Sequence, residues 1–129
     1  MATTDLTKEN FEDVIMNNDM VFVDFWASWC QPCKTFAPIY EELSEEYPDI
    51  VFGKVDTENE QELAGHFGIR SIPTLMLFRE QVIIFQESGV LPREGLESII
   101  QQARELDMDQ VRADMEQESG EAGEQGDKG

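Results

Sequence analysis

Cys30 and Cys33 are the only cysteines of the chain, and two residues separate them. They follow an apolar run over 20–26 that predicts a buried strand, and they precede a segment over 34–47 whose apolar positions repeat at helical spacing. A cysteine at a helix N-terminus faces unpaired backbone N–H groups and the positive end of the helix dipole, which stabilise its thiolate. Because the thiolate is the reactive form of the side chain, the arrangement predicts thiol–disulfide exchange.

Other uses of a CxxC pair are disfavoured by the rest of the sequence. A structural zinc site needs four ligands, and His66 is the only other soft ligand in the chain. An iron–sulfur cluster is disfavoured as well, because the chain has too few ligands to hold one. A purely structural disulfide would close too short a loop to stabilise the fold much. We therefore predict a redox-active pair and no metal, and we expect His66 to be exposed and without a role.

The composition indicates one globular domain with an acidic surface. The chain has 129 residues, of which 40% are hydrophobic, so it can build a core. Nine basic and 28 acidic residues give a formal net charge of −19, which opposes binding to nucleic acid or to anionic membranes. The N-terminal residues lack the pattern of a secretory signal, and no apolar stretch is long enough to span a bilayer. We expect a cytoplasmic protein.

Strand and helix patterns alternate along the chain. After the cysteines, apolar residues predict a strand over 50–55, a short helix over 60–64, strands over 74–78 and 82–85, and a last helix from Pro92 to Leu106. An additional helix is expected to start near Thr7. This order predicts an α/β fold: a mixed central sheet of parallel strands and a final antiparallel hairpin, with helices on both faces.

The composition changes at the C-terminal end of the chain. We predict that the domain spans residues 1–107 and that residues 108–129 form an acidic, disordered tail. Two interpretations of this tail stay open. It is either a solvated end that aids solubility or a partner-binding segment, for which Met108, Val111 and Met115 would supply apolar contacts.

Several separated motifs resemble the thioredoxin family, and the resemblance covers residues 7–106. The motifs are VDFWASWCQPCK at 23–34, Pro38 in the following helix, KVD at 54–56, FGIRSIPTL at 67–75, and Gly89. The resemblance implies the thioredoxin fold and a protein-disulfide reductase. Gln31 departs from the family, which usually has glycine at this position, and a longer polar side chain there could change the redox potential, the choice of partner, or neither.

The resemblance also implies a role for each of four residues. Cys30, expected to be the more exposed of the two cysteines, would attack a substrate disulfide as a thiolate, and the more buried Cys33 would then resolve the mixed disulfide. Asp24 interrupts an apolar strand, where a carboxylate is costly to bury, and would serve Cys33 as a general acid and base with a raised pKa. The alternative is that Asp24 lies at a strand end and reaches water or a backbone donor. Lys54 matches the lysine that neighbours this acid in the family, although an ordinary surface lysine is an equally good interpretation.

By the same resemblance, the Ile72–Pro73 bond is expected to be cis and to lie against the cysteines. The backbone of Ile72 would pair with an extended substrate segment. The residues predicted to bind substrate are Trp29, Gln31, Pro32, Ile72, Pro73, Gly89 and Val90.

The resemblance implies partners as well. These are disulfide-containing proteins as substrates and a reductase flavoenzyme as electron donor, with no cofactor bound to this chain, which would act as a monomer. Two alternatives of another class remain at this point: a holdase or scaffold that kept the fold, and an interaction module that serves a single enzyme.

Overall fold

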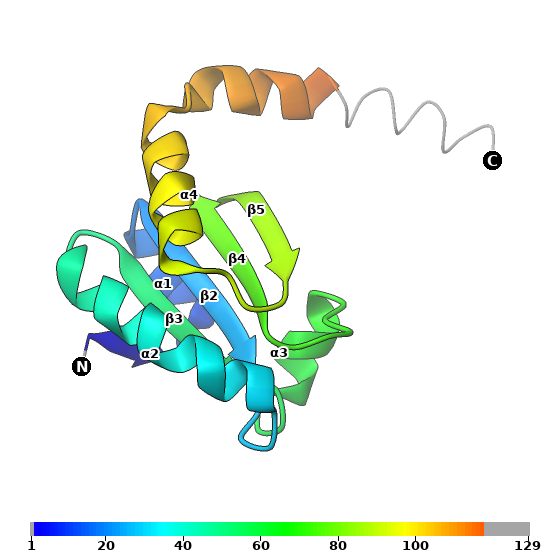
Figure 1. The fold of residues 1–129 in the computed structure, drawn as a ribbon. Coiled ribbons are helices and arrows are strands. Elements are labelled where there is room, and N and C mark those ends of the chain that lie inside the picture. Colours follow the sequence, from blue (N-terminus) through cyan, green and yellow to red (C-terminus); the bar gives the residue numbers. More distant parts are fainter. Residues whose placement is uncertain (1, 118–129) are drawn as a thin grey trace.

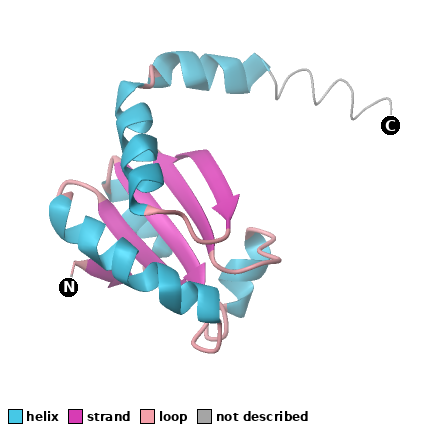
Figure 2. Cartoon of the chain, viewed as in Figure 1, coloured by secondary structure: helices cyan, strands magenta, loops and turns pink. Residues whose placement is uncertain are grey.

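A computed structural model describes residues 2–117 and contains a five-stranded mixed sheet with helices on both faces (Figures 1 and 2). The strands are β1 (Thr3–Asp5), β2 (Met20–Trp26), β3 (Val51–Asp56), β4 (Thr74–Arg79) and β5 (Val82–Ser88). The helices are α1 (Phe11–Asn17), α2 (Gln31–Glu46), α3 (Gln61–His66) and α4 (Arg93–Glu105). The sheet order is β1-β3-β2-β4-β5, with β1, β3 and β2 parallel and with β4 and β5 antiparallel to their neighbours. The predicted fold class is confirmed.

Strand β2 lies at the centre of the sheet and is buried on both faces. Phe22 on one face packs with residues of α2 and α4, such as Tyr40 and Leu96. Val23 and Phe25 on the other face pack with residues that come from α1 and α3. Figure 1 shows the corresponding layers, with α2 and α4 in front of the sheet and α1 behind it. A strand in this position needs apolar residues on both sides, which explains the continuous apolar run of the sequence.

One local structure differs from the sequence expectations, and the predicted hairpin forms without the glycine that such turns normally prefer. Helix α1 begins at Phe11 and not near Thr7, because the Asn10 side chain accepts the Thr7 N–H at 2.7 Å and forms a turn ahead of the helix. The β4–β5 connection places Glu80 at φ 49° and Gln81 at φ 68°. Positive φ at both central residues is the backbone of a tight hairpin turn that glycine and asparagine normally favour.

Residues 108–117 form a further helix after α4 (Figure 1). The Asp107 carboxylate accepts the backbone N–H groups of Asp109 and Gln110, which caps the start of this helix. Met108 is buried, and Arg112 forms an ion pair with Glu80 at 2.7 Å, so the helix packs on the hairpin end of the sheet. The rest of the predicted tail, residues 118–129, lies outside the described residues, and the domain boundary at 107/108 stays a prediction.

Among residues 2–117, none of the helices has the length and apolar composition that crossing a membrane requires.

Candidate active site

The two cysteines lie where β2 gives way to α2 and are joined by a disulfide, with their Cα atoms 5.3 Å apart. Cys30 is the N-cap residue of α2, and its Sγ accepts the backbone N–H of Cys33 at 3.2 Å. Pro32 occupies the first turn of the helix, where a missing N–H costs no intrahelical hydrogen bond. This is the helix N-terminus that the sequence predicts.

Both cysteines are only 4% exposed. The expectation that Cys30 is more exposed than Cys33 is therefore wrong for this disulfide form. The two residues form a small cluster with Ala27, and Ile72 packs against it, so a segment from another part of the chain covers the pair.

The segment before β4 completes the surroundings of the disulfide. The Ile72–Pro73 peptide bond is cis, as predicted. The Ile72 carbonyl oxygen lies 3.7 Å from Cys30 Sγ. The Pro73 carbonyl oxygen in turn accepts the backbone N–H of Gly89 at 2.8 Å. Gly89 has φ 104°, a backbone conformation that residues with a Cβ atom rarely adopt. Residues 72–73 and 89 thus meet beside the cysteines.

Two large apolar side chains of the predicted substrate surface are exposed. Trp29 is 65% exposed, and its indole N–H donates to the Glu58 carboxylate at 2.6 Å. Val90 is 40% exposed and follows Gly89. Gln31 and Pro32, in the first turn of α2, are exposed too. Exposed aromatic and aliphatic side chains next to a reactive group are typical of a surface that contacts a partner.

A cavity of about 270 Å³ lies behind Cys33 and contains the carboxylate of Asp24. It is lined by Asp24, Trp26, Ala27, Ser28, Cys33, Lys34, Ala37 and Lys54. Asp24 is 1% exposed, and its Oδ1 has no hydrogen-bond partner among the described residues. Burial raises the pKa of Asp24 from 3.8 to about 7, and the positive charge of Lys54 partly opposes this effect. Asp24 is thus a buried carboxylate whose Oδ1 accepts no hydrogen bond from the described residues, and its role as a general acid and base stays a prediction.

Lys54 lies next to Asp24 because β3 pairs with β2 in a register that places the two residues opposite each other. Its Nζ is 4.9 Å from the centre of the Trp26 ring, a cation–π distance. Lys54 thus lines the cavity beside Asp24, and its role in the site stays a prediction.

Sequence reasoning missed two residues near the site. Tyr40 is fully buried, and its hydroxyl donates to the Gly53 carbonyl at 2.7 Å. Burial and the neighbouring charge of Asp24 both raise its pKa. Tyr40 lies seven residues after Cys33, two helical turns along the same face, which is the signal that could have found it. Glu58, the partner of Trp29, lies in a turn that gives no such signal.

His66 is exposed, as expected, and its ring contacts that of Phe67 with centroids 5.0 Å apart. In the described part of the chain, no group of three or more His, Cys, Asp or Glu residues is arranged to hold a metal ion.

Comparisons with known proteins agree with this geometry. The family model described as Thioredoxin matches residues 2–102. A Streptomyces coelicolor protein named "Putative thioredoxin 2" is 54% identical over 122 residues, which cover 95% of this chain and 91% of that protein. A thioredoxin from Buchnera aphidicola is 41% identical and covers 74% of this chain and 91% of its own length.

Solved structures give the same result. A Plasmodium falciparum thioredoxin structure superposes with a TM-score of 0.72 at 34% identity and covers 78% of this chain and 98% of that one. A mutant thioredoxin from Halobacterium salinarum superposes with a TM-score of 0.75 at 32% identity and covers 81% and 93% of the two chains. With its paired cysteines, the protein is a thiol–disulfide oxidoreductase, and nothing in these comparisons favours a holdase. The chain belongs to the thioredoxin family.

Proposed function

We propose that Cys30 is the attacking cysteine and Cys33 the resolving one in the reduction of protein disulfides. The observation that carries this assignment is the N-cap position of Cys30, whose sulfur accepts the Cys33 N–H at 3.2 Å. A thiolate at this position is stabilised by that N–H and by the helix dipole. Because the two cysteines are equally buried, their exposure does not indicate which of them attacks. The assignment therefore depends on the position of Cys30 at the helix N-terminus.

The reaction then has two exchange steps. The Cys30 thiolate attacks one sulfur of the substrate disulfide, and the other substrate sulfur leaves as a thiolate. Cys33, deprotonated, attacks the Cys30 sulfur of the mixed disulfide and releases the second substrate thiolate. The substrate gains two electrons and, with two protons, becomes a dithiol. The protein ends with the Cys30–Cys33 disulfide, the form seen in the structure.

Asp24 is proposed to accept the proton of the Cys33 thiol in the second step. Its pKa of about 7 is near neutral pH, where a general base is most effective. Asp24 and Cys33 line the same cavity, which is large enough for water to connect them. Lys54 is proposed to keep the pKa of Asp24 near neutral pH, because its positive charge partly offsets the rise in pKa that burial causes.

The substrate is proposed to lie over the surface around the disulfide. That surface comprises Trp29, Gln31, Pro32, Ile72, Pro73, Gly89 and Val90. The exposed side chain of Trp29 and the proximity of the Ile72 carbonyl to Cys30 Sγ support this proposal. An extended substrate segment would pair with the Ile72 backbone, as in strand addition.

Partners and location are also proposals. Membership of the thioredoxin family supports disulfide-containing proteins as substrates and a thioredoxin-reductase flavoenzyme as electron donor. We propose that the protein works as a monomer in the cytoplasm. The presence of only two cysteines, both at the redox site, supports the location, because chains of oxidising compartments commonly carry further structural disulfides.

A trapping experiment tests the assignment of the cysteines. The Cys33→Ser variant, incubated with oxidised insulin, should accumulate a mixed disulfide through Cys30 that is visible by mass spectrometry and disappears with dithiothreitol. The Cys30→Ser variant is the matched control: it keeps one thiol at the site but should neither form the adduct at a comparable rate nor catalyse insulin reduction. Equal adduct formation by both variants would show that the order of attack is wrong.

A further inference from the structure

The positive charges of this acidic protein are distributed unevenly. Eight of its nine basic residues lie within the described residues, and five of them form ion pairs with carboxylates. These five are Lys8, Arg79, Arg93, Arg104 and Arg112. Lys54 lies over the Trp26 ring and beside Asp24. Within residues 2–117, that leaves Lys34 and Arg70 as the basic side chains with no ion pair, hydrogen bond or ring partner.

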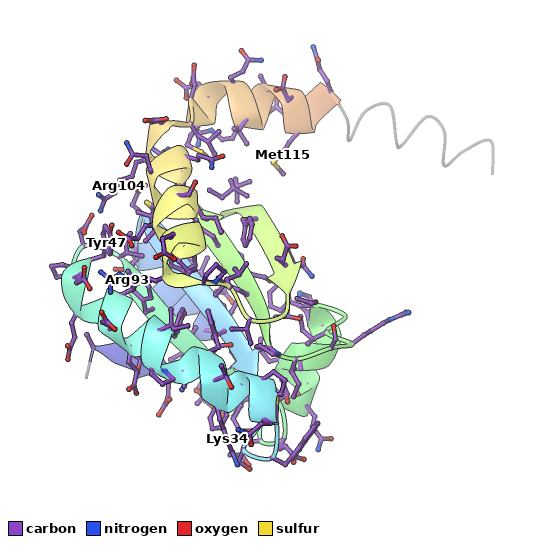
Figure 3. The ribbon with its side chains drawn as sticks, in the orientation of Figure 1. Lys34, Tyr47, Arg93, Arg104 and Met115 are labelled. Atoms are coloured by element: carbon purple, nitrogen blue, oxygen red, sulfur yellow. A yellow bond between two sulfur atoms is a disulfide. The ribbon has the colours of Figure 1, made fainter. Side chains whose placement is uncertain are left out.

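Both free cations belong to segments that contact the disulfide cluster, the first turn of α2 and the segment that precedes β4. Lys34 follows Cys33 directly in α2, its backbone N–H donates to the Cys30 carbonyl at 3.2 Å, and its exposed side chain lines the mouth of the Asp24 cavity. Arg70 is exposed and precedes Ile72 by two residues, in the segment that covers the cysteines. In Figure 3, Lys34 lies at the cysteine-bearing end of α2, whereas Arg104 lies toward the opposite end.

Three acidic side chains around the disulfide are already engaged or buried. The Glu58 carboxylate accepts the Trp29 indole N–H at 2.6 Å. The Asp56 carboxylate accepts the Glu58 backbone N–H and the Asn59 amide. Asp24 is buried in the cavity beneath. The unpaired positive charges are thus available to a bound molecule, while the protein as a whole carries a formal net charge of −19.

From this arrangement we propose that Lys34 and Arg70 select substrates that carry carboxylates beside the disulfide to be reduced. The proposal rests on the proposed function of Cys30 and names a substrate class for the same site. The two cations come from the start of α2, which holds both cysteines, and from the loop whose Ile72 carbonyl oxygen lies 3.7 Å from Cys30 Sγ. Carboxylates that flank the substrate cysteine can therefore pair with them, even though the remaining surface repels an acidic partner at longer range. At an ionic strength of about 0.1 M, charges further apart than about 10 Å are largely screened, so the local charges decide the preference.

The test uses three disulfide-cyclised peptides of one sequence, in which the residues flanking the first cysteine are Glu, Gln or Lys. The reduced full-length protein is mixed with each peptide, the reaction is quenched by alkylation, and the second-order rate constant is measured by mass spectrometry. The quantity of interest is the ratio of the Glu-peptide rate to the Lys-peptide rate. Comparing this ratio between protein variants cancels the intrinsic reactivity of the peptides.

The variants are Lys34→Gln, Arg70→Gln and their combination, with Arg104→Gln as the matched control. The control removes the same single charge but lies in the last turn of α4, beside Tyr47 at the end of α2. Helix α2 has 16 residues, so this end is roughly 24 Å from the cysteines. Each exposed ion pair is worth about a 1.4- to fivefold effect and two such effects multiply, so the combined variant should lower the ratio by roughly two- to 25-fold at low salt. Added salt should shrink the difference between the combined variant and the unmodified protein.

An unchanged ratio in the combined variant would overturn the proposal. So would an equal fall in Arg104→Gln, because net charge alone would then explain the effect. The neutral Gln peptide separates this inference from the proposed function. Failure of the unmodified protein to reduce that peptide would contradict the proposed reductase site, whereas normal reduction with an unchanged ratio overturns only the role of Lys34 and Arg70.

Discussion

Replacing Asp24 with asparagine should stabilise the fold, with the full effect at neutral and alkaline pH. Burial raises the pKa of this carboxyl from 3.8 to about 7, a difference of about three pH units. Each unit corresponds to about 1.4 kcal/mol, so keeping Asp24 ionised in the folded protein costs about 4 kcal/mol. Asparagine has nearly the same shape and no charge, so the Asp24→Asn variant avoids this cost.

The direction with pH follows from proton binding. The folded protein holds the Asp24 proton more tightly than the unfolded chain does, so raising the pH from about 4 to about 7 favours unfolding. Below about pH 4 the carboxyl is neutral in both states, and the two proteins should have similar free energies of unfolding. The advantage of the variant should grow between about pH 4 and pH 7 and then stay constant.

Chemical denaturation of the oxidised proteins across this pH range measures the effect, with the free energy of unfolding taken by linear extrapolation. Asp5→Asn is the matched control, because Asp5 is exposed and its replacement removes the same charge without a buried site. A stability difference that is the same at acid and alkaline pH would refute the reasoning. It would mean that packing or hydrogen bonding of the amide, and not ionisation, causes the change.

Three further predictions concern the packing of the domain and can be measured by the same denaturation experiment. Tyr40→Phe should cost about 1 kcal/mol, since it removes the hydrogen bond to the Gly53 carbonyl, and an unchanged stability would show that this bond contributes nothing. Gly53→Ala should cost about 1–3 kcal/mol, because the added methyl group would overlap the Leu6 side chain; a neutral effect would mean that Leu6 moves freely. Met108→Ala should cost about 2 kcal/mol, as the buried side chain anchors the helix over 108–117, and no loss would indicate that this helix does not stabilise the domain.

Much of the fold follows from local sequence patterns. The apolar run of β2 predicts a strand buried on both faces, because a one-faced strand would alternate. Cys30 and Cys33 precede a strong helical repeat, which predicts their place at a helix N-terminus. These features depend on neighbours in the chain, and the sequence therefore contains them.

The hairpin turn and the final helix depend on contacts that no local pattern reports. Glu80 and Gln81 adopt positive φ without a glycine, while the Glu80 N–H donates to the Asp19 carbonyl at 2.8 Å, far away in the sequence. The helix over 108–117 begins in a segment of weak apolar character, where burial of Met108 and the Arg112–Glu80 ion pair hold it to the sheet. In both places tertiary contacts outweigh local preference.

By itself, the sequence determined the fold class, the reactive pair of cysteines and the helix that begins at them. Tertiary structure alone decided two features of the surroundings of that pair: the cavity that Asp24 and Cys33 share, and the equal burial of the two cysteines. The physical reason is that a strand or a helix is specified by residues a few positions apart. The environment of a thiol or a carboxylate instead depends on strand register and packing, which bring together residues that are distant in the chain.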